Sequence, residues 1–152
     1  TYGDWSSDVC SSDLSESLAA SRSAAASTLL GGKADTSVGD VLSFLDEIAF
    51  WIDRGALDEE SVWYRFYWPM ANYWQASRAY REEGSNGLSE GWKHLESVLP
   101  RLAAIETRRR KDFTRDGVPD KAQVQDFLHD EAQADDTPCE EGEDQEVGMT
   151  PL

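Results

Sequence analysis

The feature that most constrains the fold is the spacing of apolar residues between positions 36 and 55. These residues recur three and four positions apart, which places them on one face of an α-helix; they are Val38, Val41, Leu42, Leu45, Ile48, Ala49 and Ile52. Thr36 or Ser37 can cap the start of this helix, and Gly55 suits the left-handed residue that follows many helices. A second helix is expected directly afterwards, with Asp58 as its N-cap.

Similar apolar stripes predict three helices besides the first, over residues 15–30, 59–83 and 89–111. Pro69 should bend the second of these or divide it in two, because proline removes a backbone donor and crowds the preceding turn. Pro100 should bend or split the third for the same reason. No segment shows the alternation that is typical of a strand. We therefore predict an all-α fold, a small bundle of about four helices over residues 15–111.

Charge divides the chain into unequal parts. Residues 112–152 contain 13 acidic and 2 basic residues, so this segment supplies −11 of the net charge of −16. Residues 15–111 contain 14 acidic and 12 basic residues and are nearly neutral. Low hydrophobicity with high net charge is typical of disorder, so 112–152 is predicted to be an acidic, mostly disordered tail. One short apolar stripe inside it predicts a short helix near 120–132.

The first residues of the chain follow neither a helical nor a strand pattern. Residues 4–14 read DWSSDVCSSDL, which lacks the basic start and apolar run of a secretory signal and the ligand spacing of a calcium loop. The same residues look like the translation of a common sequencing adapter. This resemblance implies that 1–14 is a non-native, adapter-derived segment that packs against nothing. It also implies that the native N-terminus is missing, with native sequence starting near Ser15.

Aromatic residues are concentrated between positions 50 and 80, which contain ten of them. One interpretation is a core and helix interface, since aromatic side chains bury large areas. Those on adjacent turns cannot all face one side of a helix, so the other interpretation is a surface for self-association or for a protein partner. The candidate interface residues are Trp51, Trp63, Tyr64, Tyr67, Trp68 and Trp74. Binding of nucleic acid is not expected, because few basic residues are interleaved with these aromatics.

A basic run follows at the end of the last predicted bundle helix. Arg108, Arg109, Arg110 and Lys111 are candidate contacts for anionic lipid or for the acidic tail. The alternative is a solvated helix end whose positive charge suits the helix dipole. Because the sequence contains no run of about 18 apolar residues, a membrane contact would depend on an anchor in a lost N-terminal segment.

No residue pattern indicates a catalytic, metal or cofactor site. The sequence lacks P-loop, G-x-S-x-G, H-E-x-x-H and C-x-x-C motifs. His94 has Glu90 one helical turn before it, but one histidine and one carboxylate fall short of a metal site. Outside residues 1–14, the single cysteine is Cys139, which lies among acids that disfavour a thiolate. Neighbouring acids such as Asp46 and Glu47 could supply a pair of carboxylates for acid–base chemistry. A carboxylate-based enzyme is therefore considered as a function, and it is the least favoured one.

The segment Val41–Trp74 resembles an uncharacterised bacterial all-α family of unknown function. The matching residues are Phe44, Glu47, Ile48, the run RGxLDEExVW from Arg54 to Trp63, Phe66, Tyr73 and Trp74. The resemblance implies a helical domain over about 15–105, and some members carry N-terminal membrane helices. It implies no catalytic residues, since none is established for the family. Trp51 and Pro69 depart from the family pattern.

These observations together favour a non-catalytic protein-interaction or regulatory module. Its expected partner is another protein or a second copy of itself, with no cofactor. The expected location is cytoplasmic or at the cytoplasmic face of a membrane. The alternative is the soluble portion of a membrane-anchored protein whose N-terminal anchor is missing.

Overall fold

The computed structural model describes residues 13–33, 35–83, 91–109 and 117–133, with side chains from residue 18 onward. This part of the chain forms six helices: α1 (Asp13–Leu30), α2 (Thr36–Asp53), α3 (Glu59–Ala76), α4 (Arg78–Glu83), α5 (Lys93–Arg109) and α6 (Lys121–Gln133). The prediction of an all-α fold is confirmed for these residues, but the count of about four helices is wrong. Residues 1–12, 110–116 and 134–152, which contain most of the expected adapter segment and most of the expected acidic tail, lie outside the described residues.

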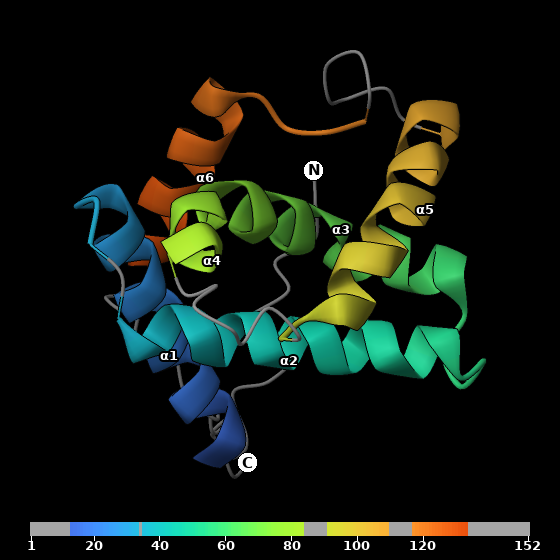
Figure 1. Ribbon diagram of the computed structural model, residues 1–152, viewed down its shortest axis with the longest axis horizontal. Coiled ribbons are helices and arrows are strands. Elements are labelled where there is room, and N and C mark those ends of the chain that lie inside the picture. The colour runs from blue at the N-terminus through green and yellow to red at the C-terminus, as the bar shows by residue number, and fades with distance from the viewer. Residues whose placement is uncertain (1–12, 34, 84–90, 110–116, 134–152) are drawn as a thin grey trace, which may run out of the picture.

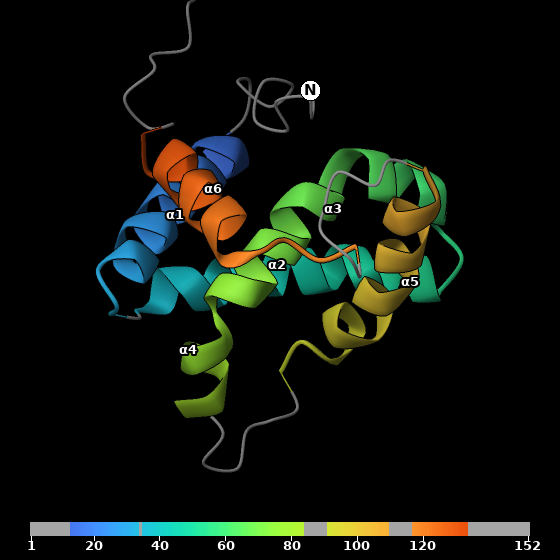
Figure 2. The ribbon, with the colours of Figure 1, turned by 90° about the horizontal axis from the view of Figure 1, so that it is seen from above.

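The helices are arranged around α2 and α3, which run side by side across the molecule (Figure 1). At one end, α1 packs against α2 and α6, and α6 also contacts α3. At the other end, α5 packs against both α2 and α3. The view from above shows the same division, with α4 projecting away from the body (Figure 2). The core is therefore continuous between the two ends, and α2 and α3 contribute to both.

The α2 helix follows the apolar stripe that predicted it. Six of its apolar side chains are buried, and Ala25 and Ala26 of α1 are buried against the same core. Small side chains at these two positions leave room for α2 to approach closely. The expected cap was wrong: Asp35 is the N-cap, and its carboxylate accepts a hydrogen bond from the backbone nitrogen of Ser37 at 2.9 Å. Gly55 ends the turn after α2 with a φ of +72°, as expected for its position.

The α3 helix begins as predicted and ends earlier than predicted. Asp58 is its N-cap and accepts a hydrogen bond from the backbone nitrogen of Ser61 at 2.9 Å. Pro69 lies inside α3 and does not divide it. The division comes at the buried Ser77, whose hydroxyl donates to the carbonyl of Trp74 at 3.3 Å. A serine that bonds to its own preceding turn competes with the helix, so the short α4 starts as a separate element.

The start of α5 is held by side chains of α2. Asp46 of α2 accepts a hydrogen bond from the backbone nitrogen of Leu95 at 2.8 Å, so it caps a neighbouring helix rather than its own. Ser43 accepts a hydrogen bond from the indole nitrogen of Trp92 at 3.1 Å. Trp92 has a φ of +68°, which is unfavourable for a bulky residue. These contacts explain why α5 begins at Lys93 rather than near residue 89. It then runs through Pro100 without a division.

The sixth helix belongs to the same core as the others. Val124, Phe127 and Leu128 are buried in the cluster that also contains the apolar residues of α1, α2, α3 and α5. The short helix near 120–132 is therefore present, and it is docked on the body through the stripe that predicted it. The helical body extends to Gln133, so the expected boundary at residue 111 is placed too early.

Candidate functional site

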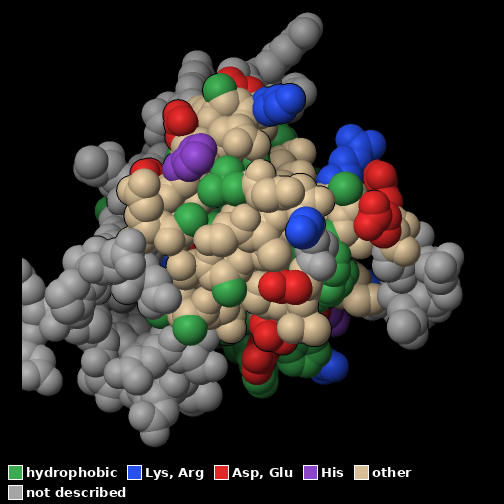
Figure 3. Space-filling view, turned by 90° about the vertical axis from the view of Figure 1, so that its left-hand side faces the viewer, with side chains coloured by type: hydrophobic (Ala, Val, Ile, Leu, Met, Phe, Trp, Pro, Cys, Tyr) green, Lys and Arg blue, Asp and Glu red, His purple; other side chains and the backbone are tan. Residues whose placement is uncertain are grey.

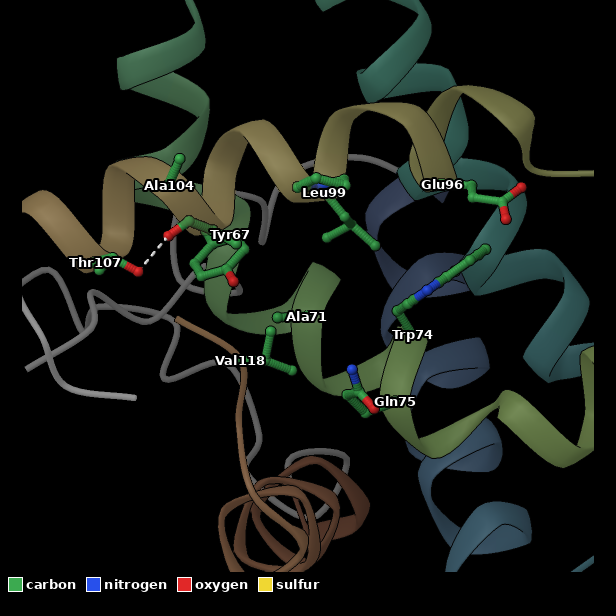
Figure 4. Close-up of a pocket in the computed structure, with 11 residues that line it drawn as sticks. Tyr67, Ala71, Trp74, Gln75, Glu96, Leu99, Ala104, Thr107 and Val118 are labelled. Carbon is green, nitrogen blue, oxygen red and sulfur yellow. Dashed lines mark hydrogen bonds between the residues drawn. The ribbon is translucent and has the colours of Figure 1, made fainter. Parts of the chain in front are cut away.

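A groove with a volume of about 680 Å³ lies between α3 and α5. The α3 helix lines it with Tyr67, Ala71, Trp74 and Gln75. The α5 helix lines it with Glu96, Leu99, Pro100, Ala103, Ala104 and Thr107. Val118 completes the lining below (Figure 4). The lining is mainly apolar with few polar groups, which is typical of binding pockets of this size.

The side of the groove near Val118 is fixed by a close contact between α5 and the residues before α6. Gly117 has a φ of +71°, and a Cβ added there would lie 2.5 Å from the carbonyl oxygen of Ala103. The Tyr67 hydroxyl donates to the carbonyl of Gly117. Burial, and secondly the nearby Glu106 carboxylate, raise the pKa of Tyr67, so the hydroxyl stays protonated as a donor. Only glycine fits this position without displacing the backbone.

A buried polar contact between α3 and α5 helps to set the spacing of the two helices. The indole nitrogen of Trp63 donates to the Glu106 carboxylate at 2.8 Å, and Glu106 is fully buried. A buried carboxylate is stable only when hydrogen bonds replace its water. Trp63 and Glu106 therefore hold the two walls of the groove at a fixed separation.

The charges at the groove lie at one end of it. Among the described residues that line the groove, Glu96 is the single charged side chain, and it faces Trp74 across the groove (Figure 4). The guanidinium carbon of Arg81 lies 3.5 Å from the centre of the Trp74 ring, a cation–π contact. Arg81 also donates to the carbonyl of Trp74 at 2.8 Å, which ties α4 to the end of α3. The Trp74 indole thus has the Arg81 guanidinium over its ring and the Glu96 carboxylate across the groove.

The structure separates the six aromatic residues that the sequence grouped as a candidate interface. Trp63 and Tyr67 are buried, so these two do not form an open surface. Trp68 and Trp74 are half-buried; Trp68 packs edge-on against Phe127 of α6, whereas Trp74 lines the groove. Trp51 and Tyr64 are exposed, at 44% and 59%. The core interpretation therefore applies to Trp63 and Tyr67. Two of the six residues line the groove, the buried Tyr67 and the half-buried Trp74.

The basic run at the end of α5 lies beside the start of α3. Arg109 Nη2 is 3.0 Å from Glu60 Oε2, and Arg108 Nη2 is 3.7 Å from Glu60 Oε1. Both arginines are more than half exposed, so these are surface pairs. Arg110 and Lys111, the other two candidate contacts for lipid or tail, lie outside the described residues. No helix in the described ranges is both long and apolar enough to cross a membrane.

His94 takes part in a surface cluster of charges. Its Nδ1 is 3.2 Å from Asp53 Oδ2, and its ring meets the Phe50 ring edge-on. Arg101 joins Asp53, at 2.9 Å, to Glu59, at 3.0 Å. Glu90, the acid that we considered with His94, lies outside the described residues. Across the described residues no three His, Cys, Asp or Glu side chains gather as a metal site requires.

Sequence reasoning missed a buried polar network at the other end of the molecule, where α3 meets α1 and α6. Arg22 of α1 pairs with Glu131 of α6 through two hydrogen bonds of 2.5 and 2.9 Å. The Tyr73 hydroxyl lies 2.9 Å from the same carboxylate, and all three side chains are buried. Burial, and secondly the charge of Glu131, raise the pKa of Tyr73. This network connects α1, α3 and α6.

A signal for this network was present in the sequence. Arg22 lies in phase with the apolar stripe of its helix, three residues before Ala25 and four before Ala26. Glu131 likewise follows Phe127 by four residues and Leu128 by three. A charge in phase with an apolar stripe must be buried with a partner, because an unpaired buried charge is too costly. Glu106 shows the same signal, four residues after Leu102.

Seen from the α1 and α6 end, the described surface carries scattered rather than gathered hydrophobic side chains (Figure 3). The groove at the α5 end is therefore the better candidate for a binding site.

Comparison of the chain with protein-family models, with curated proteins and with solved structures finds no match.

Proposed function

We propose that this protein is a non-catalytic protein-interaction module, and that its groove between α3 and α5 receives the apolar side chains of a helical segment of a partner. The observation that carries the proposal is the groove itself, about 680 Å³ in volume and lined mainly by apolar side chains. Helices with an apolar face commonly bind in grooves of this kind.

The form of the groove supports a binding role rather than a gap in packing. Its walls are held by Trp63 and Glu106 and by Tyr67 and Gly117 at one side. A site that is already shaped loses little conformational entropy when a partner binds. Trp74 offers a large half-buried ring, the kind of side chain that often dominates binding energy at an interface.

The polar groups at the groove support a non-catalytic role. General acid–base chemistry needs a positioned pair of titratable groups within reach of a substrate. Among the described lining residues, Glu96 is the one carboxylate, and no histidine or lysine joins it. His94 contacts Asp53 and Phe50 instead of lining the groove.

The test is a selection of displayed 20-residue peptides on the full chain. Selected peptides should carry apolar residues three and four positions apart, and they should lose binding to Ala104→Trp. Ala104 is exposed and lines the groove, so a tryptophan there fills it without entering the core. The matched control is Ala24→Trp, at an exposed alanine of α1. Peptides that bind Ala104→Trp as tightly as the unchanged chain would place the site elsewhere and refute the proposal.

A further inference from the structure

We infer that the partner segment is a basic amphipathic helix, which places a lysine or arginine beside Glu96 while its apolar face fills the groove. The inference rests on the proposed function and names the chemistry of the partner. It depends on the length of the groove, on the charge of its lining and on the charge of the whole chain.

The length of the groove suits a short helix. The lining residues of α5 extend from Glu96 to Thr107, a distance of about 16 Å along the helix axis. An apolar face with side chains at positions i, i+3 or i+4, and i+7 extends about 10 Å along its own axis, since each residue rises about 1.5 Å. Such a face fits within the groove with room for one further turn, and that turn would reach the end where Glu96 lies (Figure 4).

The charge at that end favours a cation. No hydrogen bond or ion pair holds the Glu96 carboxylate among the described residues, although Arg81 is close enough to interact with it electrostatically. The guanidinium of Arg81 is itself engaged by the ring and the carbonyl of Trp74. The exposed Glu96 carboxylate therefore remains accessible for pairing with a basic side chain of a partner. Because Arg81 offsets part of its charge, the expected effect of Glu96 is a few-fold change in affinity.

The charge of the whole chain acts in the same direction. Without its first 14 residues the chain still carries a net charge of −13, of which residues 112–152 supply −11, so its field attracts a cationic partner and repels an acidic one. This long-range attraction raises the rate of encounter, whereas the groove decides which side chains fit. A partner that is both basic and apolar on one face satisfies the two requirements together.

The experiment uses calorimetric titration of the full chain with two synthetic probes. The first is an 18-residue amphipathic peptide of leucine and lysine, and the second has glutamate in place of every lysine. The lysine peptide should bind, and Glu96→Lys should weaken it about fivefold, the size expected when an exposed charge pair is reversed. The matched control is Glu47→Lys, at an exposed position of α2 outside the groove, which should change the affinity less than twofold.

The outcomes separate this inference from the proposed function. If Glu96→Lys and Glu47→Lys weaken the lysine peptide equally, only the overall charge matters and the inference is refuted. Equal binding of the glutamate peptide, or failure of the lysine peptide to bind, also refutes it. If Ala104→Trp removes binding of both peptides while the two lysine variants do not differ, the groove binds apolar helices and only the partner's charge was inferred wrongly. If Ala104→Trp leaves binding unchanged, the proposed function fails as well.

Discussion

The two ends of the molecule, formed by α1 and α6 and by α5, treat most of their charged side chains in opposite ways; the exception is Glu106, which is buried at the α5 end with Trp63 as its partner. At the end formed with α1 and α6, Arg22, Glu131 and Tyr73 are buried and joined to one another. At the end formed with α5, the charges of Arg101 and its partners lie at the surface, and an apolar groove lies between the helices. The first end is closed by a polar network, and the second presents apolar surface next to charges that remain in water.

This difference shows which part of the molecule can bind a partner at low cost. Opening the α1 and α6 end would strip a buried charge of its partner, which costs several kcal/mol. A partner that enters the groove breaks no internal hydrogen bond, because its apolar side chains replace only water. The buried network thus fixes one arrangement of α1, α3 and α6, while the α5 end can exchange solvent for a ligand. The predictions below test this contrast.

The largest effect is expected from Arg22→Met. The substitution removes the guanidinium and leaves the Glu131 carboxylate buried beside Tyr73, so the free energy of unfolding should fall by about 3–5 kcal/mol. Urea unfolding of the full chain measures this loss. The double variant Arg22→Met with Glu131→Leu should recover much of it, because no charge is then left unpaired. A loss below about 1 kcal/mol for the single variant would show that the pair is solvated, and the contrast between the ends would disappear.

Gly117→Ala should lower the free energy of unfolding by about 3 kcal/mol. The left-handed backbone contributes about 1–2 kcal/mol of this, and the 2.5 Å approach of the new Cβ to the carbonyl of Ala103 contributes the rest. Gly55→Ala is the control, because Gly55 has a similar φ of +72° and nothing within 4 Å of an added Cβ. Thermal unfolding of both variants separates the two causes. Equal losses of unfolding free energy in the two variants would mean that the backbone near Val118 moves to accommodate the added methyl group.

Arg101→Met repeats the first substitution at the open end and should cost only about 0.5 kcal/mol, because exposed ion pairs contribute little. The change removes contacts to Asp53 and Glu59, and methionine keeps part of the apolar stem. The measurement is the free energy of unfolding at low salt and at 1 M salt, where screening should remove most of the difference. A loss as large as that of Arg22→Met would contradict the comparison.

The smallest effect concerns the acid dependence of the start of α3. Hydrogen bonds from the Ser61 hydroxyl and backbone nitrogen lower the pKa of Asp58. The folded protein therefore binds this proton less readily than the unfolded chain, and Asp58 stabilises the fold above its ordinary pKa of about 4. That stability should disappear as the pH falls through the lowered value. Asp58→Asn keeps a capping acceptor without the charge, so the difference in stability between the two proteins should shrink below about pH 4. A difference that stays constant with pH would contradict the assignment.

The elements were largely predictable because they depend on local chemistry. The apolar stripe of α2, the Asp58 cap and Gly55 act within a few residues of the chain, so they can be read from the sequence. The same holds for α6, whose three apolar residues predicted both the helix and its buried face. The N-cap of α2 was predicted one or two residues too late, because Asp35 and its neighbours Thr36 and Ser37 are all acceptable caps.

The partners of these elements were not predictable in the same way. The start of α5 depends on contacts with another helix, such as the bond from the backbone nitrogen of Leu95 to Asp46 of α2. The candidate interface residues separate for a similar reason: Trp63 and Tyr67 are in the core, whereas Trp51 and Tyr64 are exposed. Which face of α3 meets a neighbour depends on how three helices pack around it, and no local pattern encodes that choice.

The sequence by itself determined that this protein is helical, where most of its helices begin and end, and which apolar stripes of α2 and α6 are buried. Periodicity, caps and glycines settle these points because they act over one or two turns. Only the tertiary structure decided that Arg22 meets Glu131, that Trp63 meets Glu106, and that an apolar groove lies between α3 and α5. The two contacts join residues 109 and 43 positions apart, the groove lies between two different helices, and the geometry of all three exists only when the helices have packed together.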